Sequence, residues 1–284
     1  ARKRVDIPTA PAQITSTLVA ENSARKAAKL FHAIGAKLQQ QYAEALAAEL
    51  HTAARKAFLR PDGITLTARC QTAQAAALYF DLFEPGERQG AFQVLLDLIA
   101  ENDNSFDCGI VGLRVLFHVL SRFGKTDLAL HMITKPSFPS YGYWFQYGAT
   151  SLWELNTPVY GVQSSCNHHF YGDVAAWFLK TLAGIHLNPY GDDPDYVLLS
   201  PKFTDALNCV HASVKARAGE ISVAWERKDN TITGHITIPD SMNAQFIADE
   251  NWQLEDGFTT EKLSGTCTLR LIPAGAANTY KYIL

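Results

Sequence analysis

The spacing of hydrophobic residues changes once along the chain, near residue 190. Before that point, apolar side chains recur every three or four positions, the spacing that places them on one face of an α-helix. This pattern predicts helices over residues 21–34, 38–58, 72–83, 87–100, 109–123, 126–134 and 168–182, with a further helical signal near residue 151. Residues 5–19 contain two prolines and several β-branched residues, so they are expected to form an extended lead-in.

The predicted helices also indicate which faces lie in the core. In the helix over residues 38–58, one face is expected to point toward the core, and it carries Leu38, Tyr42, Leu46, Leu50, Ala53 and Phe58. The helix over residues 72–83 is nearly all apolar, which favours burial on most of its sides. Seven or eight helices joined by short connections are typical of antiparallel helix pairs.

From Tyr196 onward, hydrophobic residues alternate with polar ones at every second position, as in half-buried β-strands. Turn residues separate these runs, which predicts an antiparallel β-sandwich. His211, Trp225, His235 and Trp252 are expected to contribute a buried aromatic core. The stretch 186–195 is rich in proline and glycine, so we predict a helical domain over residues 1–187 and a β-sandwich over residues 188–284.

Composition excludes several classes of partner. Of the 284 residues, 47% are hydrophobic and 19% are charged, and the net charge of -3 gives no basis for a nucleic-acid or anionic-membrane partner. No apolar run is long enough for a membrane span. The five cysteines are odd in number and widely spread, which argues against a zinc site or a disulfide framework. We therefore predict no metal and no cofactor, and the compartment stays open between cytoplasm and export.

Candidate chemistry concentrates in residues 141–154, where aromatic residues surround two glycines and one carboxylate, that of Glu154. Aromatic rings offer flat apolar faces on which a sugar ring can stack, and glycine lets a backbone approach a ligand. Because Pro136 and Pro139 precede this stretch, we expect it to begin as a loop. The alternative interpretation is an aromatic cluster of the core.

Several short motifs resemble those of the family 78 glycoside hydrolases, the α-L-rhamnosidases. They are Tyr-Gly-Tyr-Trp at 141–144, Gly-Ala-Thr-Ser-Leu-Trp-Glu at 148–154, Asn167-His168 with Gly172, Gln71-Thr72-Ala73, Gly109 to Gly112 and Leu198 to Pro201. The sequence departs from the family pattern at Ser151-Leu152 and at residues 169–171, and the linker from Glu154 to Asn167 is short. The resemblance covers nearly the whole chain. It implies part of an (α/α)6 barrel, or toroid, followed by a C-terminal β-sandwich.

The resemblance also implies roles for individual residues. Glu154 would be the general base of an inverting hydrolysis of α-L-rhamnosides, and the general acid would lie upstream of this chain. Trp144 would form a wall for the sugar, His168 would donate a hydrogen bond to a sugar hydroxyl, and Trp153 would support Glu154. From the residues alone, Tyr143 is a candidate pocket residue. Asp107 is a candidate substrate-binding residue, with the cap of a helix beginning at Gly109 as the alternative.

Two other functions remain open from the sequence. One is a toroid glycosidase with another sugar specificity, and the other is a non-catalytic carbohydrate-binding or scaffold relative. The predicted partners are a carbohydrate substrate and either the missing N-terminal part of the same protein or another chain. We expect that the 284-residue chain does not catalyse by itself and that an apolar face of the helix over 72–83 needs a covering partner.

Overall fold

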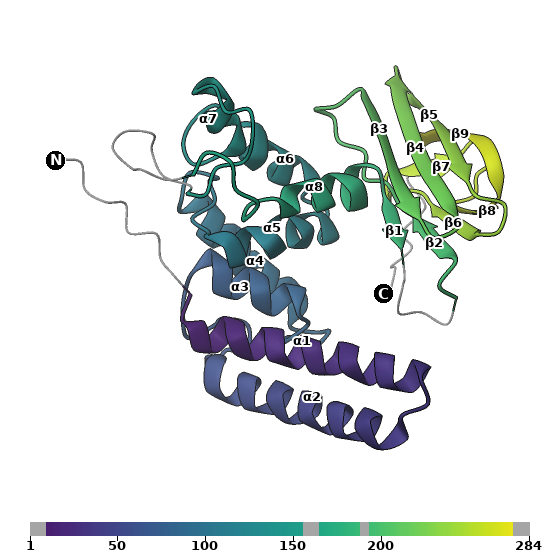
Figure 1. Ribbon diagram of the computed structural model, residues 1–284. Coiled ribbons are helices and arrows are strands. Elements are labelled where there is room, and N and C mark those ends of the chain that lie inside the picture. The colour runs from purple at the N-terminus through teal and green to yellow at the C-terminus, as the bar shows by residue number, and fades with distance from the viewer. Residues whose placement is uncertain (1–9, 156–164, 188–192, 275–284) are drawn as a thin grey trace. The chain divides into compact units, whose positions relative to one another are not determined.

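The computed structural model describes residues 10–155, 165–187 and 193–274 of the chain (Figure 1). The chain divides into two compact units, Ala1–Val174 and Ala175–Leu284. The first unit is helical and the second is built from strands, as the change of hydrophobic period predicts. The predicted domain boundary between residues 187 and 188 borders on residues 188–192, which lie outside the described residues, and it stays a prediction.

The helical unit contains seven α-helices before residue 150 among its described residues. They are α1 (Ala12–Ala33), α2 (Lys37–Phe58), α3 (Gln71–Tyr79), α4 (Arg88–Ala100), α5 (Ile110–Arg122), α6 (Thr126–Thr134) and α7 (Tyr141–Gln146). An eighth, α8 (Asp173–Trp177), crosses from the first unit into the second and continues as the π-helix η1 (Phe178–Leu182). The predicted helical signal near residue 151 is wrong, because no helix covers residues 147–155.

Helix α1 begins at Ala12, so the prediction of an extended segment through residue 19 is wrong. Pro11 occupies the N-cap position with φ −53° and ψ 132°, where the missing N–H of proline costs no helical hydrogen bond. The β-branched Ile14 is 2% exposed and Leu18 is 1% exposed. Burial of these side chains outweighs the modest helix propensity of the segment.

Helix α2 faces its neighbour with alanines rather than with its largest apolar residues. Ala43, Ala47 and Ala54 are buried, whereas Leu38 and Tyr42 are 79% and 72% exposed. The predicted inward face is therefore wrong at these two positions and also at Ala53, which is exposed. Helices α1 and α2 form a hairpin in Figure 1, and small side chains allow two helices to approach closely, so the alanines occupy the contact.

Helices α3 and α5 run parallel and form the centre of the helical unit. Thr72 lies beside Gly112 near the start of both helices, and the carbonyl oxygen of Leu78 accepts a hydrogen bond from Arg122 near their ends. Every residue from Gln71 to Leu78 is buried. Helices α1, α4 and α5 all contact α3, so the prediction that its apolar face needs an additional covering partner is wrong.

The strands of the second unit form two sheets. One has the order β1 (Ile185–Leu187), β2 (Tyr196–Leu199), β6 (Asn243–Ile247) and β8 (Thr260–Leu263). The other has the order β3 (Cys209–Ala216), β4 (Gly219–Lys228), β5 (Thr231–Ile238), β9 (Gly265–Pro273) and β7 (Trp252–Leu254). The described pairings are antiparallel, as the predicted sandwich implies, except that of β2 with β6, which is parallel.

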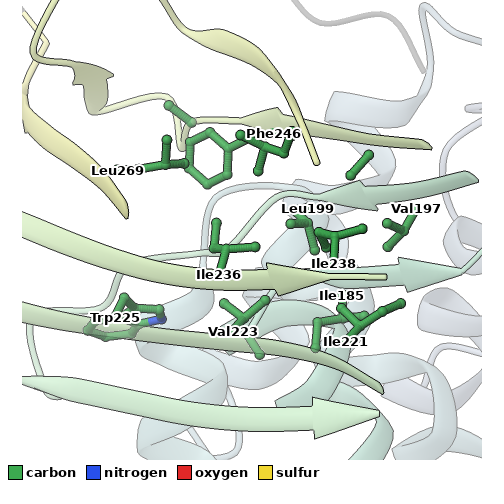
Figure 2. Close-up of a cluster of buried hydrophobic side chains, with 14 of the residues drawn as sticks. Ile185, Val197, Leu199, Ile221, Val223, Trp225, Ile236, Ile238, Phe246 and Leu269 are labelled. Carbon is green, nitrogen blue, oxygen red and sulfur yellow. The ribbon is translucent and has the colours of Figure 1, made fainter. Parts of the chain in front are cut away.

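Side chains from both sheets meet in one hydrophobic core (Figure 2). Val197, Leu199 and Phe246 come from one sheet, and Ile221, Val223 and Trp225 come from the other. The indole N–H of Trp225 donates to the carbonyl oxygen of Leu182 at 2.8 Å, which satisfies its buried polar atom. Two layers of alternating inward residues therefore form the sandwich that the sequence predicts.

The prediction of buried histidines in this core is wrong. His211 and His235 are exposed. Both pair with Ala224 of β4, His211 from β3 on one side and His235 from β5 on the other. Successive residues of a strand point to opposite faces, so the burial of Ile236 places its neighbour His235 on the outer face.

None of the described helices is long and apolar enough to cross a membrane.

Candidate active site

The aromatic stretch begins as a helix, α7, and not as the loop that the sequence predicts. Ser140 caps this helix, since its Oγ atom accepts a hydrogen bond from the backbone N–H of Tyr143 at 2.8 Å. Gly142 lies against the end of α6, and a Cβ atom at this position would be 2.3 Å from the carbonyl oxygen of Thr134. The cap fixes where the helix starts, and the glycine allows it to pack directly on the α6 backbone.

Trp144 lies in a cluster of rings. Its ring centroid is 5.2 Å from that of Tyr141, 5.6 Å from that of Tyr171 and 5.7 Å from that of Trp153, with which it stacks. The side chain is 3% exposed, and its indole N–H has no hydrogen-bond partner among the described residues. A buried donor without an acceptor is costly, so this N–H is suited to a ligand oxygen or a water molecule.

Tyr141 and Tyr143 belong to different ring groups, although both are buried. The hydroxyl of Tyr141 donates to the carbonyl oxygen of Tyr171 at 2.9 Å, and burial raises the pKa of this phenol. Tyr143 packs against Phe138 and Tyr147, with ring centroids 5.5 Å and 4.7 Å away. The role of Tyr143 as a pocket residue stays a prediction.

Glu154 is held beside the segment that contains His168. Its backbone N–H donates to the carbonyl oxygen of Ser165 at 2.9 Å, and its Oε2 atom accepts from the Ser165 N–H at 3.1 Å. The N–H of His168 donates to the carbonyl oxygen of Leu152 at 2.8 Å. These bonds align residues 152–154 with residues 165–168. Residues 156–164 of the connecting linker lie outside the described residues.

A hydrogen bond fixes the tautomer of neutral His168. Its Nδ1 atom lies 3.3 Å from the backbone N–H of Phe170, which can only donate. The proton of the neutral ring is therefore on Nε2, where it can be donated to a ligand. The rings of His169 and Phe170 flank the His168 ring at centroid distances of 5.1 Å and 3.7 Å. His168 is thus arranged as a hydrogen-bond donor.

Asp107 is not the helix cap that was the alternative to a binding role. The N-cap of α5 is Gly109, and no side chain caps this helix. Burial raises the pKa of the half-buried Asp107 carboxyl to about 6, and no described cation forms an ion pair with it. The sulfhydryl of Cys108 lies 4.0 Å from the Oδ1 atom of Asp107. An unpaired carboxylate with a raised pKa is typical of functional sites.

The structure gathers most of the predicted site residues into one region. Trp153 precedes Glu154 and stacks on Trp144, and His168 is bonded to Leu152 within the same segment. Sequence reasoning missed Ser165, which holds the Glu154 carboxylate, and Gln71, which bonds the backbone of Asp107. No sequence signal marks Ser165, whereas Gln71 is part of a recognised motif. The described residues contain no group of three or more potential ligands that could hold a metal ion.

Comparison with known proteins gives the family of the chain. Residues 6–182 match the bacterial alpha-L-rhamnosidase 6 hairpin glycosidase domain, and residues 194–256 match the bacterial alpha-L-rhamnosidase C-terminal domain. The helical unit, with the site segment between α7 and α8, therefore corresponds to a glycosidase domain of this kind. The chain is a member of the bacterial α-L-rhamnosidase family.

Individual relatives agree with this assignment. An alpha-L-rhamnosidase of Formosa agariphila is 28% identical over 231 residues, which are 79% of this chain and 25% of that protein. An alpha-L-rhamnosidase of Streptomyces avermitilis is 26% identical over 242 residues, which are 83% of this chain and 23% of that protein. The chain thus spans about a quarter of the length of these curated relatives.

Two solved structures share the fold. The Streptomyces avermitilis alpha-L-rhamnosidase complexed with L-rhamnose superposes with a TM-score of 0.79 at 24% identity, covering 94% of this chain and 26% of that one. The alpha-L-rhamnosidase from Dictyoglumus thermophilum superposes with a TM-score of 0.76 at 23% identity, covering 87% of this chain and 30% of that one. These likenesses confirm the predicted architecture of partial toroid helices followed by a β-sandwich.

Proposed function

We propose that this chain is part of an inverting glycoside hydrolase that releases terminal α-L-rhamnose from glycosides or polysaccharides. The observation that supports the proposal is the backbone pairing of residues 152–154 with residues 165–168, next to the Trp144–Trp153 stack, in a chain of the α-L-rhamnosidase family. A carboxylate can take a proton from the attacking water, while a ring N–H donor and flat aromatic faces can hold the sugar.

Glu154 is the general base in this proposal. Its Oε2 atom accepts from the Ser165 N–H, which orients the carboxylate and leaves the Oε1 atom for a water molecule. The base takes a proton from this water as the water attacks the anomeric carbon from the face opposite the leaving oxygen. The Nε2–H of His168 donates to a sugar hydroxyl, and the Trp144 indole lines the sugar site. Asp107 and Tyr143 are further substrate-binding residues.

The general acid comes from outside the 284 residues. Inversion needs two carboxyl groups about 6.5–9.5 Å apart, because a water molecule stands between the base and the sugar. The curated relatives are about four times longer than the matched part, so the rest of a longer protein supplies the second carboxyl. The 284-residue chain alone is therefore expected to leave an aryl α-L-rhamnoside intact, whereas the full-length protein hydrolyses it.

The role of Glu154 is tested by Glu154→Gln in the full-length protein. The amide keeps an acceptor for Ser165 but cannot take the proton of water, so kcat should fall about 10²–10⁴-fold with little change in KM. Proton NMR of the first sugar released by the unaltered enzyme should show the anomer opposite in configuration to the substrate. Glu44→Gln, at an exposed position of α2, is the matched control.

Three outcomes would contradict the proposal. Unchanged turnover in Glu154→Gln would show that Glu154 is not the general base. Release of the anomer with retained configuration would reject inversion. A full-length protein that binds L-rhamnose but hydrolyses no rhamnoside would instead be a carbohydrate-binding relative.

A further inference from the structure

Gln71 begins α3 with a side-chain amide that is completely buried and bonded on both sides. Its Nε2 atom donates to the carbonyl oxygens of Leu98 at 3.3 Å and Ser105 at 2.9 Å. Its Oε1 atom accepts from the backbone N–H of Asp107 at 3.2 Å and from the Cys108 sulfhydryl at 3.8 Å. One amide thus joins the end of α4, the connecting segment and the start of α5.

The segment from Ser105 to Cys108 has further supports. The amide of Asn102 donates to the Ser105 carbonyl oxygen at 2.9 Å, and the ammonium of Lys135, itself 9% exposed, bonds the Ser105 hydroxyl. These bonds fix the backbone just before Asp107. Among these three side chains, it is the amide of Gln71 that bonds the Asp107 N–H, and none of the three pairs with the carboxylate.

Asp107 is also connected to the aromatic region through its neighbour. Phe106 is 2% exposed, and its ring lies 6.4 Å from that of Tyr141, which in turn lies 5.2 Å from Trp144. A displacement of residues 105–108 would therefore move Asp107 relative to the ring cluster. The neutral amide is a suitable support, because a cation in its place would pair with the carboxylate and remove it from ligand binding.

We propose that Gln71 is a positioning residue that fixes residues 105–108 and so aims the Asp107 carboxylate at a sugar hydroxyl. This inference rests on the proposed function, in which Asp107 contacts the substrate. It assigns Gln71 no contact with the sugar and no proton transfer. Its effect on the enzyme should pass entirely through Asp107.

Gln74 offers a matched control within the same helix. It is 1% exposed, and its amide donates to the carbonyl oxygens of Ile64 at 2.7 Å and Ala91 at 2.9 Å while accepting from the Leu66 N–H at 3.3 Å. It is thus as buried and as fully bonded as Gln71, but it holds a different connection. Gln71→Met and Gln74→Met remove the same polar group and keep a similar volume.

The experiment compares Gln71→Met, Gln74→Met, Asp107→Asn and the double variant Gln71→Met/Asp107→Asn in the full-length protein. Loss of a charged hydrogen bond should raise KM for an aryl α-L-rhamnoside roughly 10–100-fold in Asp107→Asn. Gln71→Met should raise KM about 10-fold with a smaller change in kcat, and Gln74→Met should leave both unchanged. The double variant should resemble Asp107→Asn alone, since both changes remove one contact.

A second measurement reports on the backbone of residues 105–108 and does not depend on enzyme activity. Hydrogen exchange at the amides of residues 105–108 should be faster in Gln71→Met and unchanged in Gln74→Met. Additive effects in the double variant, equal effects of the two glutamine variants on KM, or unchanged exchange in Gln71→Met would overturn the proposal. If Asp107→Asn keeps its KM while Glu154→Gln loses turnover, this inference fails and the proposed function stands. If Glu154→Gln keeps its turnover while the exchange and KM results hold, the base assignment fails and Gln71 keeps its role.

Discussion

The parallel helices α3 and α5 are held by charge at one end and by a neutral amide at the other. Near their C-terminal ends, the carbonyl oxygens of Leu78, Phe80 and Leu82 accept hydrogen bonds from Arg122, Arg25 and Arg55. Asp81 lies within 4 Å of three arginines there. Near their N-terminal ends, Gln71 bonds the backbone and Asp107 has no described cation beside it.

This difference separates the stabilising end of the helix pair from the candidate functional end. Paired charges contribute to stability only when both partners are present, and they are then unavailable to a ligand. The carboxylate of Asp107 is left unpaired at a cost in stability, as its raised pKa of about 6 indicates. Residues that serve binding are commonly unfavourable for folding.

Arg55→Met should give the largest loss of stability. The guanidinium of Arg55 makes two bonds to the Glu87 carboxylate, at 2.8 and 2.9 Å, and one to the Leu82 carbonyl oxygen at 2.7 Å. Its loss leaves partly buried acceptors unsatisfied, so α3 and α5 should lose about 3 kcal/mol of protection in native-state hydrogen exchange. Pairing lowers the pKa of Glu87 below its ordinary 4.5, so this contribution should be present above that pH and disappear as the pH falls below it.

The control for this prediction is Arg69→Met. Arg69 and Glu101 form the same two-bond geometry, at 2.5 and 2.7 Å, but both side chains are mostly exposed. Its removal should change stability by about 0.5 kcal/mol or less. Equal losses in the two variants would show that burial of the Arg55 pair is unimportant.

Gly112→Ala should have the next largest effect, at the opposite end of the helix pair. A Cβ atom at Gly112 would lie 2.3 Å from Thr72 Oγ1 and 2.7 Å from Cys108 Cβ. The helices must separate to admit it, so about 2 kcal/mol of protection should be lost in the same exchange experiment. Gly109→Ala, where a Cβ atom meets nothing within 4 Å, should be close to neutral. A neutral Gly112→Ala would mean that α3 and α5 separate at little cost.

Asp107→Asn should have the smallest effect on stability and the opposite sign. The folded protein holds the carboxyl proton with a pKa of about 6 against an ordinary 3.8, so stability falls as the pH rises between these values and stays lower at neutral pH. The partly exposed asparagine variant should be about 1 kcal/mol more stable at pH 7 and should lack this pH dependence. A less stable variant would place Asp107 among the stabilising residues.

The sequence predicts the two kinds of unit because hydrophobic period depends only on local geometry. Residues 71–134 are helical and residues after 196 form strands, as the periods of 3.6 and 2 require. Helix α1 starts within the extended segment predicted over residues 5–19, because Pro11 serves as the N-cap of the helix. The inward face predicted for α2 is partly wrong, because small alanines occupy the close helix contact and leave larger apolar residues outside it.

Features that depend on contacts between residues far apart in the sequence could not be predicted from the hydrophobic pattern. The parallel pairing of β2 with β6 joins residues 47 positions apart, and alternation of side chains does not specify strand order. Gln71 is bonded to residues 27 to 37 positions away, so its sequence neighbours do not reveal its function. For the candidate site, the family motifs indicated Glu154, Trp144 and His168, whereas their support by Ser165 and Tyr171 required the structure.

The direct contact of Gly142 with the α6 backbone has a consequence for ligand binding. Because no side chain separates the two helices there, α7 has little freedom to shift. The ring of Trp144 packs against those of Tyr141 and Trp153. The entropy of ordering these aromatic side chains is therefore spent during folding, before any sugar arrives. Under the proposed function, we expect the cluster to form a preorganised wall whose shape is the same in the free and the bound protein, so that binding energy goes into the sugar contacts themselves.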